Sequence, residues 1–246
     1  MSETLKKSVA IVTGGSKGYG LGIAGALKRC GADVWITGRD QKALDAAVKE
    51  LGVHAIQADV ASGKDWDRVF DTVTRAHGRL DILVNNAGAG IRIAPVSTQT
   101  DADIEQSIAV NLTGAMFGCR RAAGIMMKQK SGIMVNISSV CACYAWPGWG
   151  VYSAAKAGLG QFSKSLYAEV REHGVRVTTV IPSWGATEFV GAADLAGHPA
   201  NKQEVRDLCM QPREMGEVVV HVCEMPAHLN VLEYKVLPTV QEIMPL

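Results

Sequence analysis

A tyrosine and a lysine four positions apart, Tyr152 and Lys156, are the residues of this sequence best suited to acid–base chemistry. If the segment after Gly150 is helical, residues at this spacing lie on one face, so the phenol and the ammonium face the same space. The ammonium favours ionisation of the phenol, which can then take up or release a proton in a reaction. Ser138 and Ser139 add hydroxyl groups just upstream. A surface Tyr and Lys also occur at this spacing by chance, so the rest of the chain must decide.

Around this pair, short apolar runs alternate with amphipathic stretches, which predicts strands alternating with helices. Because the strands are nearly all apolar, we expect a parallel sheet covered on both faces. The sequence therefore predicts one doubly wound (Rossmann-like) α/β domain over residues 1–246, with about seven strands. Strands are expected at 9–12, 32–37, 53–58, 81–84, 132–138 and 175–181, and helices at 21–29, 41–51, 62–77, 102–128 and 150–173. Ser62 and Asp65 resemble a capping box at the third helix.

Polar or turn-forming motifs directly follow the expected strands. They are Thr13–Gly20, Gly38-Arg39, Asp59, Asn85–Gly88, Ser138-Ser139 and Pro182-Ser183. In doubly wound folds the ligand binds beyond the carboxyl ends of the strands, so these motifs gather along one edge. This coincidence is the strongest functional signal in the chain.

The first of these motifs, T-G-G-S-K-G-Y-G, lies between a strand and a helix. Glycines there let the backbone turn tightly and approach a pyrophosphate at the helix N-terminus. The spacing is G-x-x-x-G-x-G, not the commoner G-x-G-x-x-G. It predicts a dinucleotide site.

From Val9 to about Gln241 the sequence resembles the short-chain dehydrogenase/reductase family. The resemblance is carried by Thr13-Gly14-x-x-x-Gly18-x-Gly20, Asp59-Val60, Asn85–Gly88, Asn111, Ser139 and Tyr152-x-x-x-Lys156. It implies a catalytic tetrad of Asn111, Ser139, Tyr152 and Lys156, with Ser139 chosen over Ser138 by its offset from the tyrosine. It also implies cofactor contacts from Gly14, Ser16, Lys17, Gly18, Tyr19, Gly20, Arg39, Asp59, Val60, Asn86, Ala87, Gly88, Tyr152, Lys156, Pro182 and Thr187.

Reduction of a ketone or aldehyde needs a hydride from a nicotinamide and a proton for the oxygen. Tuning a tyrosine from a pKa of ~10 towards ~7 requires about 4 kcal/mol of preference for the phenolate. Lys156 and the positive charge of the oxidised nicotinamide would together supply it. In this hypothesis Tyr152 transfers the proton and Ser139 polarises the carbonyl. Lys156 also holds the ribose hydroxyls, and Asn111 anchors a water that passes the proton to solvent.

The end of the second strand bears on the choice of cofactor. An acidic residue there would bind the ribose 2′-hydroxyl of NAD, but this chain has Gly38 followed by Arg39. Arg39 and Lys17 suit a phosphate dianion, so NADP(H) is favoured over NAD(H). The nearby carboxylate of Asp40 could still serve NAD.

Two stretches depart from the family pattern. Pro182-Ser183 replaces the usual Pro-Gly, and the segment Glu233–Thr239 resembles a branch that includes reductases of small hydroxy acids and related aldehydes. The substrate loop is expected at about 187–211. Candidate substrate contacts are Cys141, Trp146, Trp149 and Trp184, near Cys143, Tyr144 and Phe189. Such rings suit an apolar or aromatic carbonyl compound, or they pack the loops and a subunit contact. For an anionic substrate, Arg92 is the plausible cation.

Composition excludes several classes of function. With 48% hydrophobic residues and a net charge of +1, the chain is an ordinary globular protein without a footprint for nucleic acid or an anionic membrane. Its six cysteines form no C-x-x-C pair, so we expect reduced thiols and no metal site. No signal or membrane-spanning segment is apparent, which predicts a cytoplasmic protein. Apolar residues on several faces of the long helices suggest an oligomer, and the resemblance implies a tetramer.

Three functions remain open at this point. The first is an NADPH-dependent carbonyl reductase, reversible as an alcohol dehydrogenase, with a small-molecule substrate. The second is a 3-oxoacyl carrier-protein reductase, for which Lys128, Lys130 and Arg171 are candidate basic residues at the mouth of the site. The third is a nucleotide-binding protein that has lost the chemistry. Because all four tetrad residues are present, the third is disfavoured.

Overall fold

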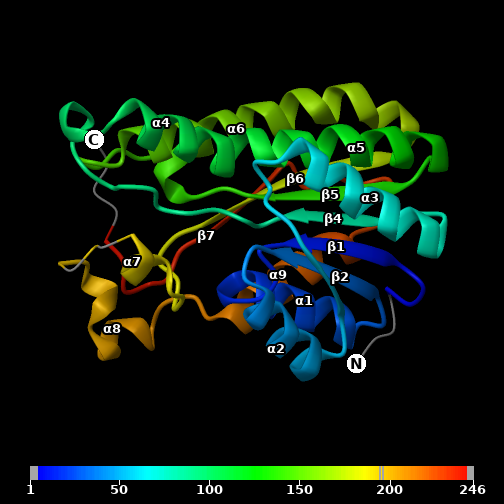
Figure 1. Cartoon of the computed structure of the whole chain (residues 1–246), viewed down its shortest axis with the longest axis horizontal. Helices are drawn as coiled ribbons and strands as arrows, with labels where there is room; N and C mark the ends of the chain where they lie inside the picture. The colour runs from blue at the N-terminus through cyan, green and yellow to red at the C-terminus, as the bar shows by residue number, and fades with distance from the viewer. Residues whose placement is uncertain (1–4, 194, 196, 243–246) are drawn as a thin grey trace.

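The computed structural model describes residues 5–193, 195 and 197–242, and the chain folds as three layers (Figure 1). Within these residues seven parallel strands form one sheet in the order β3-β2-β1-β4-β5-β6-β7. The strands are β1 Val9–Thr13, β2 Asp33–Gly38, β3 His54–Gln57, β4 Ile82–Asn85, β5 Gly132–Ile137, β6 Val175–Pro182 and β7 Glu233–Val236. The predicted doubly wound, Rossmann-like domain is thereby confirmed.

Helices cover both faces of the sheet (Figure 1). On one side lie α1 (Gly18–Arg29), α2 (Gln41–Leu51) and α9 (Pro212–Glu224). On the other side lie α3 (Gly63–His77), α4 (Asp101–Ile108), α5 (Gly114–Gln129) and α6 (Gly150–Val170). The short helices α7 (Phe189–Ala192) and α8 (Gln203–Arg206) lie beyond the end of the sheet at which β6 stops.

The central strand β1 divides its side chains between two cores. Ala10 and Val12 pack into the core beneath α1 and α9, whereas Val9 and Ile11 pack into the core beneath α3 and α5. Successive side chains of a strand point to opposite faces, so a strand covered on both faces must be apolar throughout. This explains why the strands appear in the sequence as continuous apolar runs.

Polar side chains fix where three helices begin. Asp40 caps α2 by accepting a hydrogen bond from the N–H of Ala43, and Thr100 forms a capping box with Asp103 at α4. Ser62 caps α3 by accepting from the N–H of Asp65. The expected reciprocal bond of a Ser62–Asp65 box is not formed, because the carboxylate of Asp65 accepts from the N–H of Asp59 instead.

The predicted helix over 102–128 is interrupted by one π-helical turn, Ala109–Thr113, between α4 and α5. The turn contains Asn111, whose side-chain amide donates to the carbonyl of Ser107. Single π-turns inside α-helices are frequent at functional sites. Among the described helices, none combines the length and the apolar character needed to cross a membrane.

Candidate active site

The glycine-rich turn after β1 lies against the end of β4. Gly14 has a φ of +62°, and a Cβ there would lie 3.1 Å from Cα of Ala87. A Cβ at Gly20 would clash with the carbonyl oxygen of Gly14. All residues of α1 are described by the structure. Its first turn contains no acidic residue, and the side chain of Lys17, the residue before it, makes no hydrogen bond to the N–H groups of that turn. The first-turn N–H groups can therefore bind an anion such as the pyrophosphate of a dinucleotide.

Thr13, at the end of β1, joins this turn to the segment after β4. Its hydroxyl oxygen accepts hydrogen bonds from the N–H groups of Asn86 and Ala87, at 3.0 and 2.9 Å. The side-chain amide of Asn86 donates to the carbonyl of Thr13 at 2.9 Å. These bonds hold the Asn85–Gly88 segment beside the glycine-rich turn, at the point where the strand order reverses.

Asn111 and Lys156 both approach the backbone at Gly88. A Cβ at Gly88 would lie 3.0 Å from Oδ1 of Asn111 and 3.2 Å from Nζ of Lys156. The buried carboxamide of Asn111 accepts from the N–H of Ala89 and donates to its carbonyl. The ammonium of Lys156 donates to the carbonyl of Ile137 at 2.9 Å. Two tetrad residues thus lie next to each other at the carboxyl ends of β4 and β5.

The two serines after β5 have different partners. The hydroxyl of Ser138 donates to the carbonyl of Lys156 at 2.9 Å and so ties β5 to α6. The hydroxyl oxygen of Ser139 accepts from the N–H of Cys141 at 3.2 Å, and the hydroxyl lies close enough to the phenol of Tyr152 to lower its pKa. Ser139 is therefore the serine beside the phenol, as the choice between the two predicted.

Burial dominates the titration of the tyrosine and the lysine. It raises the pKa of Tyr152, which Cys141 raises further and the hydroxyl of Ser139 lowers. It lowers the pKa of Lys156 to about 8. Nζ of Lys156 lies 5.8 Å from the centre of the Tyr152 ring. The protein's own groups thus leave the pKa of Tyr152 raised, and its predicted lowering depends on the positive charge of an oxidised nicotinamide.

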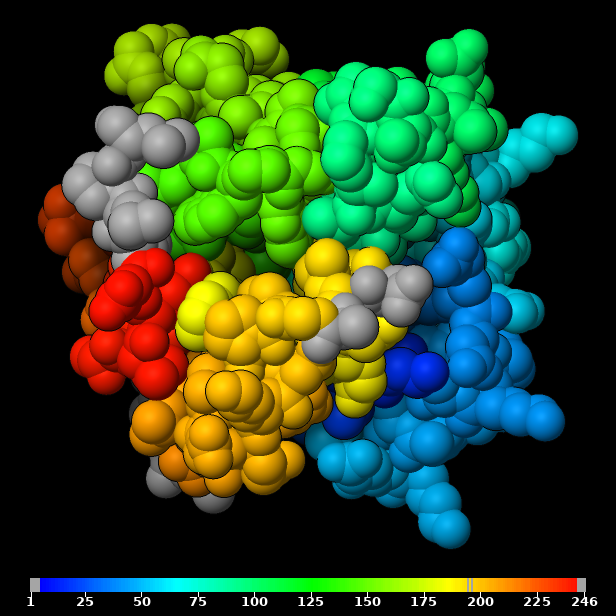
Figure 2. All heavy atoms as spheres, turned by 90° about the vertical axis from the view of Figure 1, so that its left-hand side faces the viewer, coloured from blue at the N-terminus to red at the C-terminus, as the bar shows by residue number. Residues whose placement is uncertain are grey.

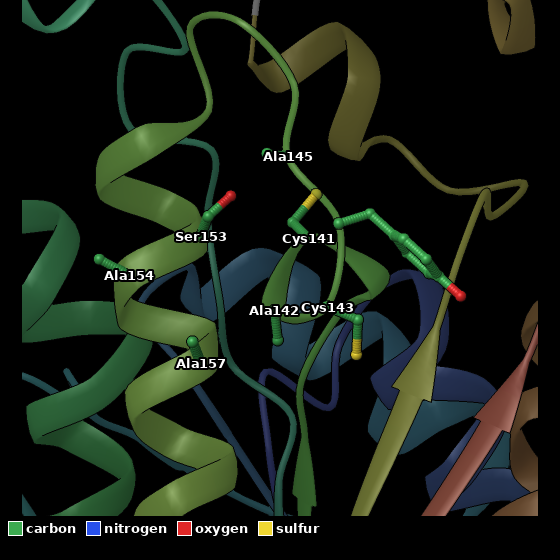
Figure 3. A pocket seen from close by; sticks show the side chains of 8 residues that line it. Cys141, Ala142, Cys143, Ala145, Ser153, Ala154 and Ala157 are labelled. Carbon is green, nitrogen blue, oxygen red and sulfur yellow. The ribbon is translucent and has the colours of Figure 1, made fainter. Parts of the chain in front are cut away.

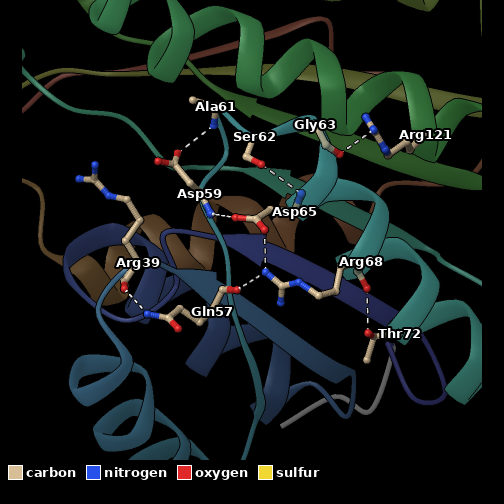
Figure 4. A network of polar contacts seen from close by, with 10 residues as sticks. All are labelled: Arg39, Gln57, Asp59, Ala61, Ser62, Gly63, Asp65, Arg68, Thr72 and Arg121. Carbon is tan, nitrogen blue, oxygen red and sulfur yellow. Dashed lines mark hydrogen bonds and ion pairs between the residues drawn. The ribbon is translucent and has the colours of Figure 1, made fainter.

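The residues predicted to bind the adenosine end of the cofactor lie at and after the ends of β2 and β3 (Figure 4). Nζ of Lys17 lies 3.7 Å from the carboxylate of Asp40. The N–H of Ala43 is the first cause of the lowered pKa of Asp40, and Lys17 adds to it. The backbone carbonyl of Arg39 accepts from the side-chain amide of Gln57 at 2.9 Å, and its side chain is exposed.

Asp59 and Val60 form a tight turn at this end. The carboxylate of Asp59 accepts from the N–H of Ala61 at 2.9 Å (Figure 4). The carbonyl of Val60 accepts from the indole N–H of Trp66. These bonds fix the backbone of the turn without using the side chain of Val60, which is half-buried.

The segment after β6 reaches back to the glycine-rich turn. A Cβ at Gly18, whose φ is +49°, would lie 3.3 Å from Cβ and Cγ2 of Thr187. The hydroxyl of Tyr19 lies against Gly185, buried and without a hydrogen-bond partner among the described residues. Pro182 ends β6 opposite Val236. The motifs predicted at the strand ends therefore surround one edge of the sheet.

A family model matches most of the chain that forms this site. The model for short chain dehydrogenases covers residues 8–195. The chain belongs to the short-chain dehydrogenase family. Its members are oxidoreductases that act on CH–OH groups with a nicotinamide cofactor.

Individual relatives cover most of the chain. Sulfoacetaldehyde reductase 2 of Chromohalobacter salexigens is 30% identical over 239 residues, 95% of this chain and 95% of its own length. The 3-oxoacyl-[acyl-carrier-protein] reductase of Synechocystis sp. is 37% identical over 191 residues, 75% of this chain and 77% of its own. The closed form of a serine dehydrogenase complexed with NADP+ superimposes with a TM-score of 0.89 at 29% identity, covering 97% of this chain and 98% of that one.

The segment after β6, which the sequence predicts to be the substrate loop, crosses the middle of one face in yellow and orange (Figure 2). Of the candidate contacts, Trp149 lies beside Tyr152, with ring centres 5.6 Å apart. Cys141 is buried next to Ser139. Trp146 instead packs on Tyr144, and Trp184 packs on His198 within a small separate core.

The C-terminal segment holds the turn at Ser183, where the family pattern has glycine. The hydroxyl of Ser183 donates to the side-chain oxygen of Gln241, which also accepts from the N–H of Trp184. Sequence reasoning missed Gln241, because nothing in the sequence indicates that the chain returns to this turn after β7.

A surface pocket of about 510 Å³ opens between α6 and the loop after Ser139 (Figure 3). In the figure, Ser153 lies on α6 and Cys141 lies on the facing loop. Its lining is uncharged: Cys141, Ala142, Cys143, Tyr144, Ala145, Ser153, Ala154 and Ala157.

The basic residues expected at the mouth of an acyl carrier-protein site are misplaced for that role. Lys128 and Lys130 lie where α5 ends, just before β5 begins, and Arg171 follows α6, just before β6 begins. Parallel strands begin at the edge opposite to the one where they end. That interpretation of these three residues is therefore wrong, since the tetrad lies at the carboxyl ends of β4 and β5.

Proposed function

We propose that this protein reduces a ketone or aldehyde to an alcohol with NADPH, reversibly, and that Tyr152 is its proton donor. The observation that carries the proposal is the convergence of the tetrad. Asn111 and Lys156 meet at Gly88, and Ser139 lies beside the phenol of Tyr152. A buried phenol flanked by a hydroxyl and an ammonium suits proton transfer to a carbonyl oxygen.

When bound, the nicotinamide supplies the hydride. Tyr152 gives a proton to the substrate oxygen, and Ser139 donates a hydrogen bond that orients it. Lys156 holds the ribose hydroxyls and, together with the positive charge of an oxidised nicotinamide, favours the phenolate. Asn111, fixed by Ala89 and the π-turn, anchors the water that returns a proton to the site.

The glycine-rich turn and the uncapped first turn of α1 fit a dinucleotide. We therefore assign the cofactor contacts that the sequence predicts. They are Gly14, Ser16, Lys17, Gly18, Tyr19, Gly20, Arg39, Asp59, Val60, Asn86, Ala87, Gly88, Tyr152, Lys156, Pro182 and Thr187. NADP(H) is preferred because the side chain of Arg39 is exposed, while the carboxylate of Asp40 caps α2 and is paired with Lys17. The serine dehydrogenase that superimposes with this chain was solved with NADP+.

The proposal also covers the substrate loop, the type of substrate, the location of the protein and its assembly. The segment at about 187–211 is the substrate loop, and the substrate is a small molecule. The protein acts in the cytoplasm as a homo-oligomer, a tetramer by family resemblance. Light scattering at micromolar concentration tests the assembly, and a monomer would contradict it.

The 3-oxoacyl carrier-protein reductase is the second candidate, favoured by the Synechocystis relative. The positions of Lys128, Lys130 and Arg171 weigh against it. Reduction of an oxoacyl thioester at a rate above that of simple ketones would favour it over the first.

The decisive experiment follows NADPH oxidation with a panel of ketones, aldehydes, keto acids and oxoacyl thioesters. Tyr152→Phe is expected to lower kcat by about 1,000-fold or more, because it removes the proton donor, while the Kd for NADPH changes by only a few-fold. Near-normal turnover in the variant would refute the role of Tyr152.

A further inference from the structure

Two aromatic rings lie beside the ring of Tyr152. Trp149 and Phe189 each lie with their ring centres 5.6 Å from that of Tyr152. They stack on each other at 6.4 Å with an interplanar angle of 16°. Because Trp149 precedes α6 and Phe189 begins α7, the rings approach from different elements. A substrate whose carbonyl oxygen reaches Tyr152 must therefore lie against them.

Arg92, the expected cation for an anionic substrate, is paired elsewhere. Its Nε lies 3.7 Å from the carboxylate of Asp103. That carboxylate also accepts from the N–H and the hydroxyl of Thr100, which lower its pKa together with Arg92. Asp103 thus stays ionised and neutralises Arg92.

The remaining charges around the rings do not favour an anion. Among the described residues, Lys156 is the one cation over any of the three rings, and its ammonium donates to Ile137. Lys235 lies over the ring of Tyr144 instead. The carboxylate of Glu188, next to Phe189, lies 3.5 Å from the Cβ position of Gly18. Residues 1–4, 194, 196 and 243–246 include no Lys or Arg.

A carboxylate or sulfonate placed against Trp149 and Phe189 would lose hydration without gaining a counter-charge from these rings. Burying an unpaired charge is strongly unfavourable, whereas apolar surface gains from the same burial in proportion to its area. Flat aromatic groups gain further from offset or edge contacts with the two rings. The same surface thus rejects anions and retains aromatic groups.

We propose that the substrate is an uncharged carbonyl compound with an aromatic or bulky apolar substituent, and that the site discriminates against carboxylates and sulfonates. The proposal rests on the function proposed above. It separates this protein from its relative that is named for sulfoacetaldehyde, a substrate with a sulfonate group.

The test compares methyl benzoylformate with benzoylformate, which share a ketone and a ring and differ in charge. The kcat/KM for the ester is expected to exceed that for the acid by about 100-fold. Equal values, or a preference for the acid, would overturn the proposal. Binding of both compounds to the NADP+-loaded enzyme is measured by calorimetry as well. If neither is reduced but the ester binds more tightly, the proposed reaction fails and the charge preference stands; tighter binding of the acid overturns the preference.

Three variants localise the effect. Phe189→Arg supplies the missing cation and should raise the kcat/KM for benzoylformate relative to the ester by about tenfold. Phe189→Leu, its matched control, keeps an apolar side chain and should keep the preference for the ester. Arg92→Ala should change neither substrate's kcat/KM, because Arg92 is tied to Asp103. A selective loss of acid reduction in Arg92→Ala would show that Arg92 reaches the substrate, against the proposal.

Discussion

Asn111 and Lys156 both approach Gly88, with Oδ1 at 3.0 Å and Nζ at 3.2 Å from the position that a Cβ would take there. The two residues come from different elements, the π-turn and α6. Gly88 therefore leaves room for the side chains of two predicted tetrad residues, because a larger residue there would press on both. In the proposed site, the Asn85–Gly88 segment would therefore position two residues of the proposed tetrad in addition to its predicted contact with the cofactor.

Gly88→Ala is expected to lower kcat by about tenfold to 100-fold. The added methyl group would press on Asn111 and Lys156, and overpacking of this kind costs about 1–3 kcal/mol. Steady-state kinetics measure the loss, and circular dichroism checks that the variant folds. Unchanged kinetics would mean that the site adapts without cost.

Gly124→Ala is the matched control for this substitution. Gly124 lies in the exposed part of α5, and a Cβ there would meet nothing within 4 Å. The variant should keep its kcat and gain about 0.5–1 kcal/mol in the free energy of unfolding, because alanine favours the helix over glycine.

Arg39→Ala is expected to lower kcat/KM for NADPH by about tenfold to 100-fold while that for NADH changes little. A charge-assisted hydrogen bond to the 2′-phosphate accounts for this size of effect. Asp40→Asn should act in the opposite direction by a few-fold. It removes the negative charge beside Lys17 and retains a side chain able to cap α2. An unchanged NADPH/NADH preference in Arg39→Ala would contradict the assignment.

Lys156 should make stability depend on pH, because burial lowers its pKa from 10.5 to about 8. Below about pH 8 both folded and unfolded chains carry the proton, and the full cost of the buried charge is present. Between about 8 and 10.5 the folded chain loses the proton and the unfolded chain keeps it, so this contribution to the free energy of unfolding rises with pH. The slope is at most about 1.4 kcal/mol per pH unit.

The contribution is isolated as the difference between the wild type and Lys156→Met in urea unfolding from pH 7 to 10. Subtraction is needed because burial raises the pKa of Cys119 and Cys223 to about 12, which opposes the trend at higher pH. Lys164→Met, on the same helix but half exposed, controls for the loss of a lysine. A difference curve that stays flat between pH 8 and 10 would rule out the lowered pKa.

The sequence predicted the sheet well, and the structure places the predicted tetrad residues at the strand ends, for a physical reason. Strands buried on both faces are continuous apolar runs, and ligand-binding loops must then follow their carboxyl ends. Tyr152 and Lys156 could be placed together because helical spacing is local. Asn111 was located within a long helix, but the π-turn that orients it has no pattern of its own in the sequence.

Other features depend on contacts between distant segments, which spacing cannot reveal. The bond between Gln241 and Ser183 joins the chain end to β6. Trp149 and Trp184 looked alike in the sequence, yet one lies against Tyr152 and the other packs on His198. Asp103 was not recognised as the partner of Arg92, although its position in the first turn of a helix was a usable signal.

Tyr19→Phe is expected to stabilise the protein without ligand. The hydroxyl of Tyr19 is buried against Gly185 and finds no hydrogen-bond partner among the described residues. Leaving such a group unsatisfied costs about 1–3 kcal/mol, so removing it should raise the free energy of unfolding by about 1 kcal/mol. Denaturant titration of the ligand-free protein measures the change. A lower stability would show that the hydroxyl is bonded, for instance to an ordered water.

The same variant tests whether that hydroxyl contributes to cofactor binding. Tyr19 belongs to the glycine-rich turn, and burial raises the pKa of its phenol, with further contributions from Cys209, Glu214 and Tyr152. The phenol therefore stays protonated and available as a donor. If it donates to the bound dinucleotide, NADPH should stabilise Tyr19→Phe less than the wild type, with a Kd raised about threefold to tenfold. Tyr167→Phe, in which the half-buried tyrosine of α6 is changed, should alter neither quantity. An equal Kd for NADPH in Tyr19→Phe and the wild type would show that the hydroxyl does not contribute to cofactor binding.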